Sequence, residues 1–226
     1  MPRVVLMLVL VLLLAAAGCG GDDGSDEAAD TTTETTETGG ATGCSKVEAP
    51  APRKGGGATE PGERLDPERT WTLTFDTSCG RFVVTLDTAG APATTASLVA
   101  LAEDGFFDDT LFHRVVPGFV IQGGDPTQTG TGGPGYSTVD APASDTTYVR
   151  GVMAMAKTAA EPAGTAGSQF FVVTGTNIGL PPEYAVVGRV TEGLDVALLI
   201  DAIGDPTTEQ PLLPVVVESV TAASSG

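Results

Sequence analysis

From Trp71 onwards, apolar and polar residues alternate along the chain. The alternation covers 71–76 and returns over 82–86, on either side of a turn that contains Gly80. A period of two places every second side chain on one face of a strand, so each stretch has one face suited to burial. The pattern predicts a β-hairpin with one buried face.

Two later stretches have helical spacing instead. Pro92 suits the first turn of a helix that carries Leu98 and Leu101 on its inner side and stops at Gly105. Over 196–203 the apolar residues fall at i, i+3, i+4 and i+7, just before Gly204. We therefore expect two amphipathic helices within a domain that is otherwise built of strands.

The remaining apolar runs are short and separated by turn residues. They cover 112–116, 119–121, 152–156, 170–173, 185–190 and 214–220. With the hairpin they make roughly eight strands. Roughly eight strands with two helices favour a mainly β fold, a closed eight-stranded antiparallel barrel with the helices over its open ends.

The N-terminus has the pattern of an export signal. Arg3 precedes an unbroken apolar run, Val4–Ala17, which is shorter than the about 20 residues that a membrane-spanning helix needs. The run ends in Ala16-Ala17-Gly18-Cys19, which resembles the lipobox of bacterial lipoproteins. That resemblance implies a signal peptide over 1–18 and an acylated Cys19. Plain secretion with an incidental cysteine is the alternative.

We expect the acylated chain to lie outside the cytoplasm, on the outer face of the cytoplasmic membrane or on another membrane of the cell envelope. A diacylglycerol on Cys19 would suffice for stable anchoring, since more than one acyl chain is needed. Residues 19–70 are rich in Thr, Gly, Pro and acidic side chains and show no apolar periodicity. This composition predicts a flexible stalk, followed by a folded domain over 71–226.

Acylation of Cys19 would leave two thiols, Cys44 and Cys79. Two thiols in an oxidising compartment favour a disulfide, which would join the end of the stalk to the domain. Two independent thiols, with Cys44 exposed, is the alternative.

The composition and motifs of the chain argue against several classes of function. The 226 residues carry a formal charge of −18, which a nucleic acid would repel, and contain one His and three Cys, too few for a zinc-type cage. Residues 130–135 match G-x-G-x-x-G but open no helix, and Ser168 lacks the second glycine of a nucleophile elbow. No metal and no cofactor are expected, and these stretches read as surface turns and loops.

Cations are scarce in the domain, which makes Arg114 notable. It lies inside the apolar stretch 112–121, with Phe119 and Gln122 close behind it in the sequence. A snorkelling arginine beside a core phenylalanine is the simplest interpretation. The segment 112–125, however, strongly resembles the cyclophilins, the cyclosporin-binding type of peptidyl-prolyl cis-trans isomerase. Three further blocks match in order, at 151–156, 167–172 and 184–190.

This resemblance covers about 71–221 and implies a barrel with a proline pocket on its outer face. Arg114 matches the family's catalytic arginine. Residues that match peptide-binding positions are Phe119, Gln122, Ala156, Gln169, Phe171, Leu180 and Tyr184. Lys157 departs from the family, because an Asn often follows Met-Ala there, and Gly179 stands where cyclosporin-sensitive members have Trp.

Prolyl isomerisation breaks no bond, so a charged donor at the prolyl nitrogen and a dry pocket are chemically sufficient for a selective effect on the transition state. We expect a monomeric isomerase that assists folding of exported proteins by acting on their proline-containing segments. A cyclophilin-like peptide-binding or chaperone module with little isomerase activity is the alternative. His113 would point away from Arg114 on a strand and is expected to have a structural role.

Overall fold

The computed structural model describes residues 43–226. The predicted signal peptide, the acylation site Cys19 and the part of the predicted stalk before residue 43 lie outside the described residues. Across 43–226, none of the helices combines the length and apolar character needed to span a membrane.

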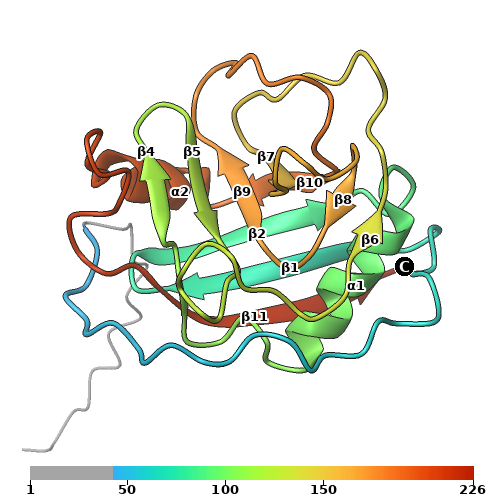
Figure 1. The fold of residues 1–226 in the computed structure, drawn as a ribbon, viewed down its shortest axis with the longest axis horizontal. Helices are drawn as coiled ribbons and strands as arrows, with labels where there is room; N and C mark the ends of the chain where they lie inside the picture. Colours follow the sequence, from blue (N-terminus) through green and yellow to red (C-terminus); the bar gives the residue numbers. More distant parts are fainter. Residues whose placement is uncertain (1–42) are drawn as a thin grey trace, which may run out of the picture. The chain divides into compact units, whose positions relative to one another are not determined.

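An antiparallel sheet of nine strands forms the body of the domain (Figure 1). Its order is β3-β11-β1-β2-β10-β7-β9-β5-β4. The strand bounds are β1 Thr70–Thr77, β2 Gly80–Leu86, β3 Thr110–Leu111, β4 Arg114–Val116, β5 Val120–Gly123, β7 Val152–Met155, β9 Phe170–Val173, β10 Val186–Glu192 and β11 Val216–Ser225. A separate pair joins β6 (Thr138–Val139) to β8 (Thr165–Ala166).

The two edges of the sheet meet. Edge strands β3 and β4 follow each other in the chain, separated by Phe112 and His113, and a single bridge pairs Leu111 with Asp125 just beyond β5. The mainly β fold with two helices is therefore confirmed, and the curled sheet forms a half-barrel whose edges are linked by this one bridge. The strand count differs from eight, because the apolar run 112–116 is interrupted where Phe112 turns into the core, and short strands form on either side.

Both expected helices are present. Helix α1 (Pro92–Glu103) packs against β11 and β6, and α2 (Leu194–Ala202) packs against β2, β4 and β5. Gly193 opens α2 with a φ of +71°, and a Cβ there would meet the carbonyl oxygen of Arg81 at 2.3 Å. Glycine is thus required at this junction both for its backbone angle and for its size.

Strand alternation divides the apolar side chains between an interior core and a smaller outer cluster. In β9, Phe170 belongs to the interior, where its ring meets the edges of Phe75 and Phe112. Its neighbour Phe171 belongs to the outer cluster, together with Val120 and Tyr148. A pocket built on this outer cluster therefore leaves the core intact.

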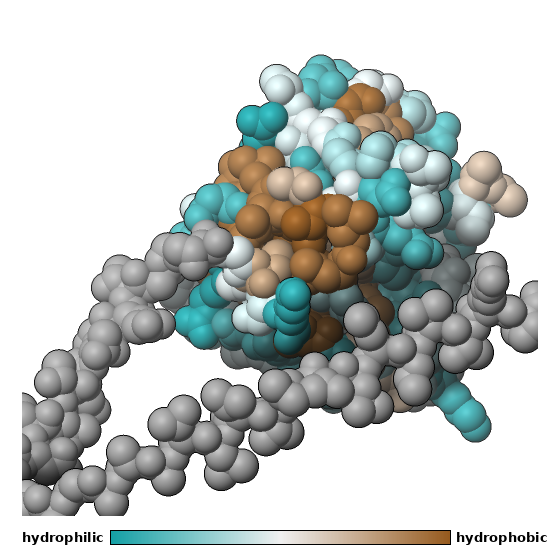
Figure 2. Space-filling view, turned by 90° about the vertical axis from the view of Figure 1, so that its left-hand side faces the viewer, coloured by the Kyte–Doolittle hydropathy of each residue, from teal (hydrophilic) through white to brown (hydrophobic). Residues whose placement is uncertain are grey.

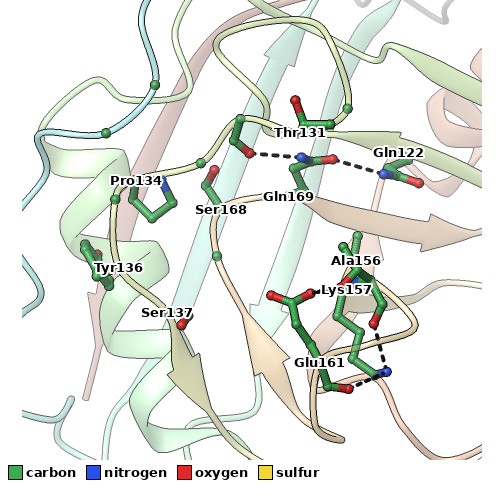
Figure 3. A pocket seen from close by; sticks show the side chains of 18 residues that line it. Gln122, Thr131, Pro134, Tyr136, Ser137, Ala156, Lys157, Glu161, Ser168 and Gln169 are labelled. Atoms are coloured by element: carbon green, nitrogen blue, oxygen red, sulfur yellow. Dashed lines mark hydrogen bonds between the residues drawn. The ribbon is translucent and has the colours of Figure 1, made fainter.

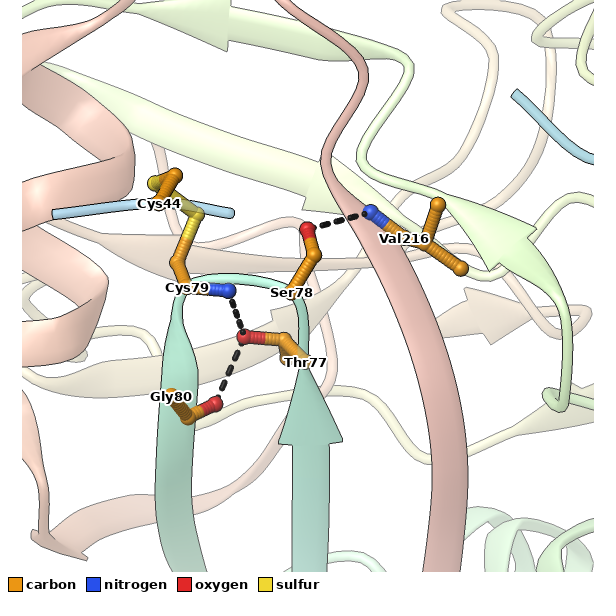
Figure 4. Close-up of a disulfide and its surroundings, with 6 residues drawn as sticks. All are labelled: Cys44, Thr77, Ser78, Cys79, Gly80 and Val216. Carbon is orange, nitrogen blue, oxygen red and sulfur yellow. Dashed lines mark hydrogen bonds between the residues drawn. A yellow bond between two sulfur atoms is a disulfide. The ribbon is translucent and has the colours of Figure 1, made fainter. Parts of the chain in front are cut away.

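Residues 44–58, which we call the N-terminal strap, have no helix or strand but are attached to the domain. Figure 4 shows the disulfide that joins Cys44 to Cys79 in the β1–β2 turn, beside a hydrogen bond from the backbone N–H of Val216 to Ser78 Oγ. Backbone hydrogen bonds also tie Arg53 to Pro126 and Gly56 to Gly133. The sequence predicts a flexible stalk at these residues, whereas the structure attaches them to the domain. The segment has few apolar side chains, and its backbone groups form the hydrogen bonds that hold it.

The side of the domain that carries α2 and the segment 204–214 has an apolar surface patch, seen in Figure 2. Leu212 is 73 % exposed, and its N–H donates to the carbonyl of Ile203 at 2.8 Å. Isolated exposed apolar side chains are normal on soluble proteins, so Leu212 alone indicates no partner.

Candidate functional site

Outside the sheet, strands β4, β5 and β9 and the loop 178–184 enclose a pocket of about 240 Å³. Its lining comprises Arg114, Phe119, Val120, Gln122, Ala156, Lys157, Phe171, Leu180 and Tyr184. Seven of these nine residues were proposed from the sequence as catalytic or peptide-binding. An eighth predicted residue, Gln169, lines the neighbouring pocket instead.

The floor of this pocket is apolar, and packing and hydrogen bonds beneath it hold its side chains in place. Phe171 is 4 % exposed and packs edge-on against the ring of Tyr184, with ring centres 5.6 Å apart. The hydroxyl of Tyr148 donates to the carbonyl of Tyr184 at 2.7 Å and accepts from its N–H at 3.0 Å. Burial raises the pKa of Tyr148 above 10.0, so this hydroxyl stays protonated at neutral pH. The hydroxyl of Tyr148 therefore fixes the position of Tyr184 through the backbone N–H and the carbonyl of that residue.

Arg114 lies at the rim with its guanidinium held on two sides. Its Nε donates to Glu209 Oε2 at 2.7 Å, and its Nη1 donates to Gln122 Oε1 at 3.4 Å. The pairing of β4 with β5 sets Arg114 directly opposite Gln122, which places both side chains on the same face. A permanently charged donor thus stands beside an apolar cavity.

A chain of amides continues from Arg114 across the site. Gln122 Nε2 donates to Gln169 Oε1 at 3.1 Å, and Gln169 Nε2 donates to the carbonyl of Gly132 at 2.9 Å, as the dashed lines in Figure 3 show. The N–H of Ala156 donates to the carbonyl of Gln169 at 2.8 Å. These contacts orient the amides, so each side chain presents a defined group to a ligand.

A second and larger pocket, about 660 Å³, adjoins the first and shares Gln122, Ala156 and Lys157 with it. Its far side is the glycine-rich loop 130–135, and Figure 3 shows Pro134, Tyr136 and Ser168 around it. The sequence predicts a surface turn for this loop. In the structure the loop is indeed irregular, but it also forms a pocket wall.

Asp125 holds this loop in shape. The carboxylate is fully buried and accepts five hydrogen bonds, from Thr127 N and Oγ1 and from the N–H groups of Thr129, Gly130 and Gly132. Burial raises the pKa of Asp125, but the hydrogen bonds outweigh that effect, so the pKa lies below the ordinary 3.8. The carboxylate is therefore ionised at neutral pH and acts as the hub of the loop.

Lys157 stands between the two pockets. Its side chain is 2 % exposed, and Nζ pairs with Glu183 at 3.1 Å while donating to the carbonyl of Glu161 at 3.1 Å. The ammonium also lies 5.5 Å from the ring centre of Tyr184. Lys157 thus links the loop after β7 to the wall of the smaller pocket.

His113 does not line the apolar pocket and lies next to a different cavity, which it forms with 210–215. Both ring nitrogens are buried without a hydrogen-bond partner among the described residues. Burial lowers the pKa of His113 below 6.5, so the ring is neutral at pH 7. This placement agrees with the structural role expected from strand alternation.

A family model described as "Cyclophilin type peptidyl-prolyl cis-trans isomerase/CLD" matches residues 72–222. The chain belongs to the cyclophilin family. Its N-terminal strap lies before the matched range, and its strands, both helices and both pockets lie almost wholly within it.

Curated cyclophilins show the same relationship. The chain is 36% identical over 144 residues to the peptidyl-prolyl cis-trans isomerase ppi1 of Schizosaccharomyces pombe, a match that covers 62% of this chain and 91% of the relative. It is 37% identical over 169 residues to the probable peptidyl-prolyl cis-trans isomerase A of Mycobacterium leprae, covering 66% of this chain and 91% of the relative. The chain is thus a cyclophilin-type isomerase with an additional N-terminal region.

Among solved structures, a Cryptosporidium parvum cyclophilin-type isomerase is similar to this chain with a TM-score of 0.63 and 28% identity. The match covers 68% of this chain and 99% of that protein, whose crystal structure was determined in the presence of the dipeptide Ala-Pro. The shared fold supports the half-barrel arrangement described above.

Two parts of the site of this cyclophilin could not be found from the sequence. They are the carboxylate of Glu209 and the backbone of Gly55 and Gly56. Glu209, the partner of Arg114, is 95 residues away in the chain and lies in a polar loop that resembles any solvated turn. The strap residues Gly55 and Gly56, which line the larger pocket, have no side chain that could indicate a role. Lys157 had a different signal in the sequence, because a lysine stands there where the family often has an Asn.

Proposed function

We propose that this cyclophilin accelerates rotation about X-Pro bonds through Arg114. Amide resonance gives that rotation a barrier of about 18–20 kcal/mol. As the bond twists, conjugation is lost and the prolyl nitrogen becomes able to accept a hydrogen bond. A donor aimed at this nitrogen stabilises the twisted state more than the planar one, and that difference is what lowers a barrier.

Among the residues that the structure describes, several N–H groups of Arg114 have no partner and can serve this purpose. A guanidinium has five N–H donors, and the contacts with Glu209 and Gln122 engage two of them. Arginine stays charged at every physiological pH, so its action requires no proton transfer. The neighbouring apolar wall excludes water, which strengthens the hydrogen bond.

The remaining residues bind and orient the peptide. Phe119, Phe171 and Leu180 line a cavity suited to the pyrrolidine ring, and the side-chain amide of Gln122 lines the same cavity beside Arg114. One charge-assisted hydrogen bond contributes about 1.5–3 kcal/mol. A rate gain of about 10⁴-fold needs roughly 5.5 kcal/mol, so desolvation and distortion of the bound peptide supply the rest.

The observation that carries this proposal is the position of Arg114 in the same apolar cavity as Phe119 and Phe171. The test is a proline-limited peptide assay on the chain from residue 20, comparing the wild type with Arg114→Ala. Arg81→Ala on β2 is the matched control, since Arg81 is an exposed arginine paired with Asp76. We expect a loss of at least 100-fold for Arg114→Ala and none for Arg81→Ala. Equal rates for all three proteins would favour a peptide-binding module without catalysis.

We propose further that the protein is exported, anchored by lipid at Cys19, and acts on proline-containing segments of other exported proteins. The signal pattern in 1–18 supports export, and so does the Cys44–Cys79 disulfide, a bond typical of oxidising compartments. Mass analysis of the mature N-terminus tests the acylation. Cys19→Ser should move the protein from the membrane fraction to the soluble fraction, and its retention on the membrane would contradict the anchor.

A further inference from the structure

The N-terminal strap lies against the loop that forms the larger pocket. Four backbone-directed hydrogen bonds join the strap to the loop 126–135. Gln128 Nε2 donates to the carbonyl of Pro50, and the N–H groups of Arg53, Gly56 and Ala58 donate to the carbonyls of Pro126, Gly133 and Pro134. Their lengths run from 2.7 to 3.1 Å. The strap thus follows the loop over most of the loop's length.

The two backbones approach so closely at the pocket that side chains there have little room. A Cβ on Gly55 would lie 3.2 Å from the carbonyl oxygen of Gly133, and a Cβ on Gly135 would lie 3.1 Å from Cα of Gly56. Gly56 and Gly135 also have φ values of +79° and +98°, which favour glycine. The glycines of both segments therefore allow two backbones to pack directly, and Gly55 and Gly56 become part of the pocket lining.

This packing reaches the peptide-binding amides. The carbonyl of Gly133 accepts from Gly56, and the preceding carbonyl, that of Gly132, accepts from Gln169 Nε2 at 2.9 Å. Gln169 in turn accepts from Gln122. The strap and the amide chain thus hold adjacent peptide units of one loop from opposite sides.

The strap is anchored to the domain at two further points, Cys44 and Arg53. The disulfide between Cys44 and Cys79 attaches the beginning of the strap, and the guanidinium of Arg53 donates to the carbonyls of Phe106 and Asp108 at 2.7 and 2.6 Å. A segment without regular structure therefore keeps a defined position beside the pocket.

We propose that strap residues 53–58 are a specificity-determining part of the peptide-binding surface, which sets how well side chains flanking the proline are accepted. The proposal rests on the function proposed above. An extended peptide advances about 3.3 Å per residue, so a chain with its proline in the smaller pocket places a neighbouring residue over the larger one. That pocket is completed by Gly55 and Gly56, which come from outside the range shared with other cyclophilins.

The experiment uses the chain from residue 20 and two peptides that differ in the residue two positions before proline, Ala in one and Leu in the other. The variants are Arg53→Ala and Cys44→Ser, which release the strap at separate anchors. Arg64→Ala is the control, because Arg64 is an exposed arginine that lies outside the strap. Both kcat/KM and the dissociation constant are measured for each peptide, and circular dichroism checks that each variant is folded.

We expect kcat/KM for the Leu peptide to fall about fivefold in both strap variants, through KM and not kcat, because a wall for an apolar side chain is lost. The Ala peptide and the Arg64→Ala variant should show no change. An unchanged ratio between the two peptides in folded strap variants would overturn the proposal, and so would an equal loss on both peptides. A wild type that binds both peptides without isomerising them would contradict the proposed function instead, and the dissociation constants would still test the strap.

Discussion

Arg114 and Glu209 form an ion pair at the rim of the proline pocket, with Nε and Oε2 2.7 Å apart. The two side chains are 35% and 47% exposed, so solvent screens the attraction and the pair adds little to stability. The backbone also joins these segments, because the N–H of Val115 donates to the carbonyl of Glu209 at 2.8 Å. We infer that Glu209 orients the guanidinium and is a positioning residue.

Replacement of Glu209 should therefore alter catalysis more than stability. Glu209→Ala removes the acceptor that fixes Nε, and we expect kcat to fall about three- to tenfold while KM stays close to the wild-type value. Glu209→Gln keeps an acceptor oxygen and should retain most of the activity. The measurement is the peptide isomerisation assay with both variants, and equal kcat values for Glu209→Ala and wild type would rule out the positioning role.

Asp125 offers a second test, since its carboxylate organises the loop that contacts Gln169. Asp125→Asn replaces one acceptor oxygen by an NH₂ group that faces backbone N–H groups. Each buried donor left without a partner costs about 1–3 kcal/mol, so we expect the free energy of unfolding to fall by about 2–3 kcal/mol. Urea denaturation measures this change. The exposed Asp145→Asn is the matched control, and an equal effect of both substitutions would contradict the role of Asp125.

His113 determines an expected pH dependence of stability. Because burial lowers its pKa in the folded state below 6.5, the unfolded state binds more protons once the pH drops below that value. The contribution of His113 is thus fully present above pH 6.5 and is lost as the pH falls through the folded-state pKa. Melting temperatures between pH 5 and 7.5 should decrease toward low pH less steeply in His113→Gln than in the wild type.

Catalysis should not follow this titration. His113 does not line the apolar pocket, so kcat/KM should be nearly constant from pH 6 to 8 and His113→Gln should remain active. An inflection near pH 6.5 that disappears in the variant would show that the imidazole takes part in the reaction.

The disulfide should stabilise the domain as well as the strap. It links residues 35 positions apart in the sequence. In the chain-entropy model a loop of that size contributes about 3–4 kcal/mol. Cys44→Ser should therefore lower the melting temperature by roughly 6–15 °C. Wild-type protein unfolded in the presence of a reductant should match the variant, and a variant as stable as the oxidised wild type would contradict this contribution.

Local patterns in the chain were sufficient to predict most of this fold. Alternation at β1 and β2 and the 3.6-residue spacing in α2 each report which face is buried, because burial of apolar surface imposes the period of the element on the sequence. The same alternation separates Phe170 from Phe171. Family motifs then identified Arg114 and the residues around it as candidates, and the structure brings seven of these candidates into one pocket.

Relationships between distant polar segments could not be predicted in this way. Glu209 meets Arg114 across 95 residues, and the strap joins the loop 126–135 through backbone hydrogen bonds and glycine contacts. Backbone groups are the same in every residue, and the sequence does not show whether an exposed carboxylate has a partner. Neither kind of contact produces a periodic pattern in the sequence. These contacts are decided by the tertiary structure, because the curled sheet and the disulfide bring the segments together.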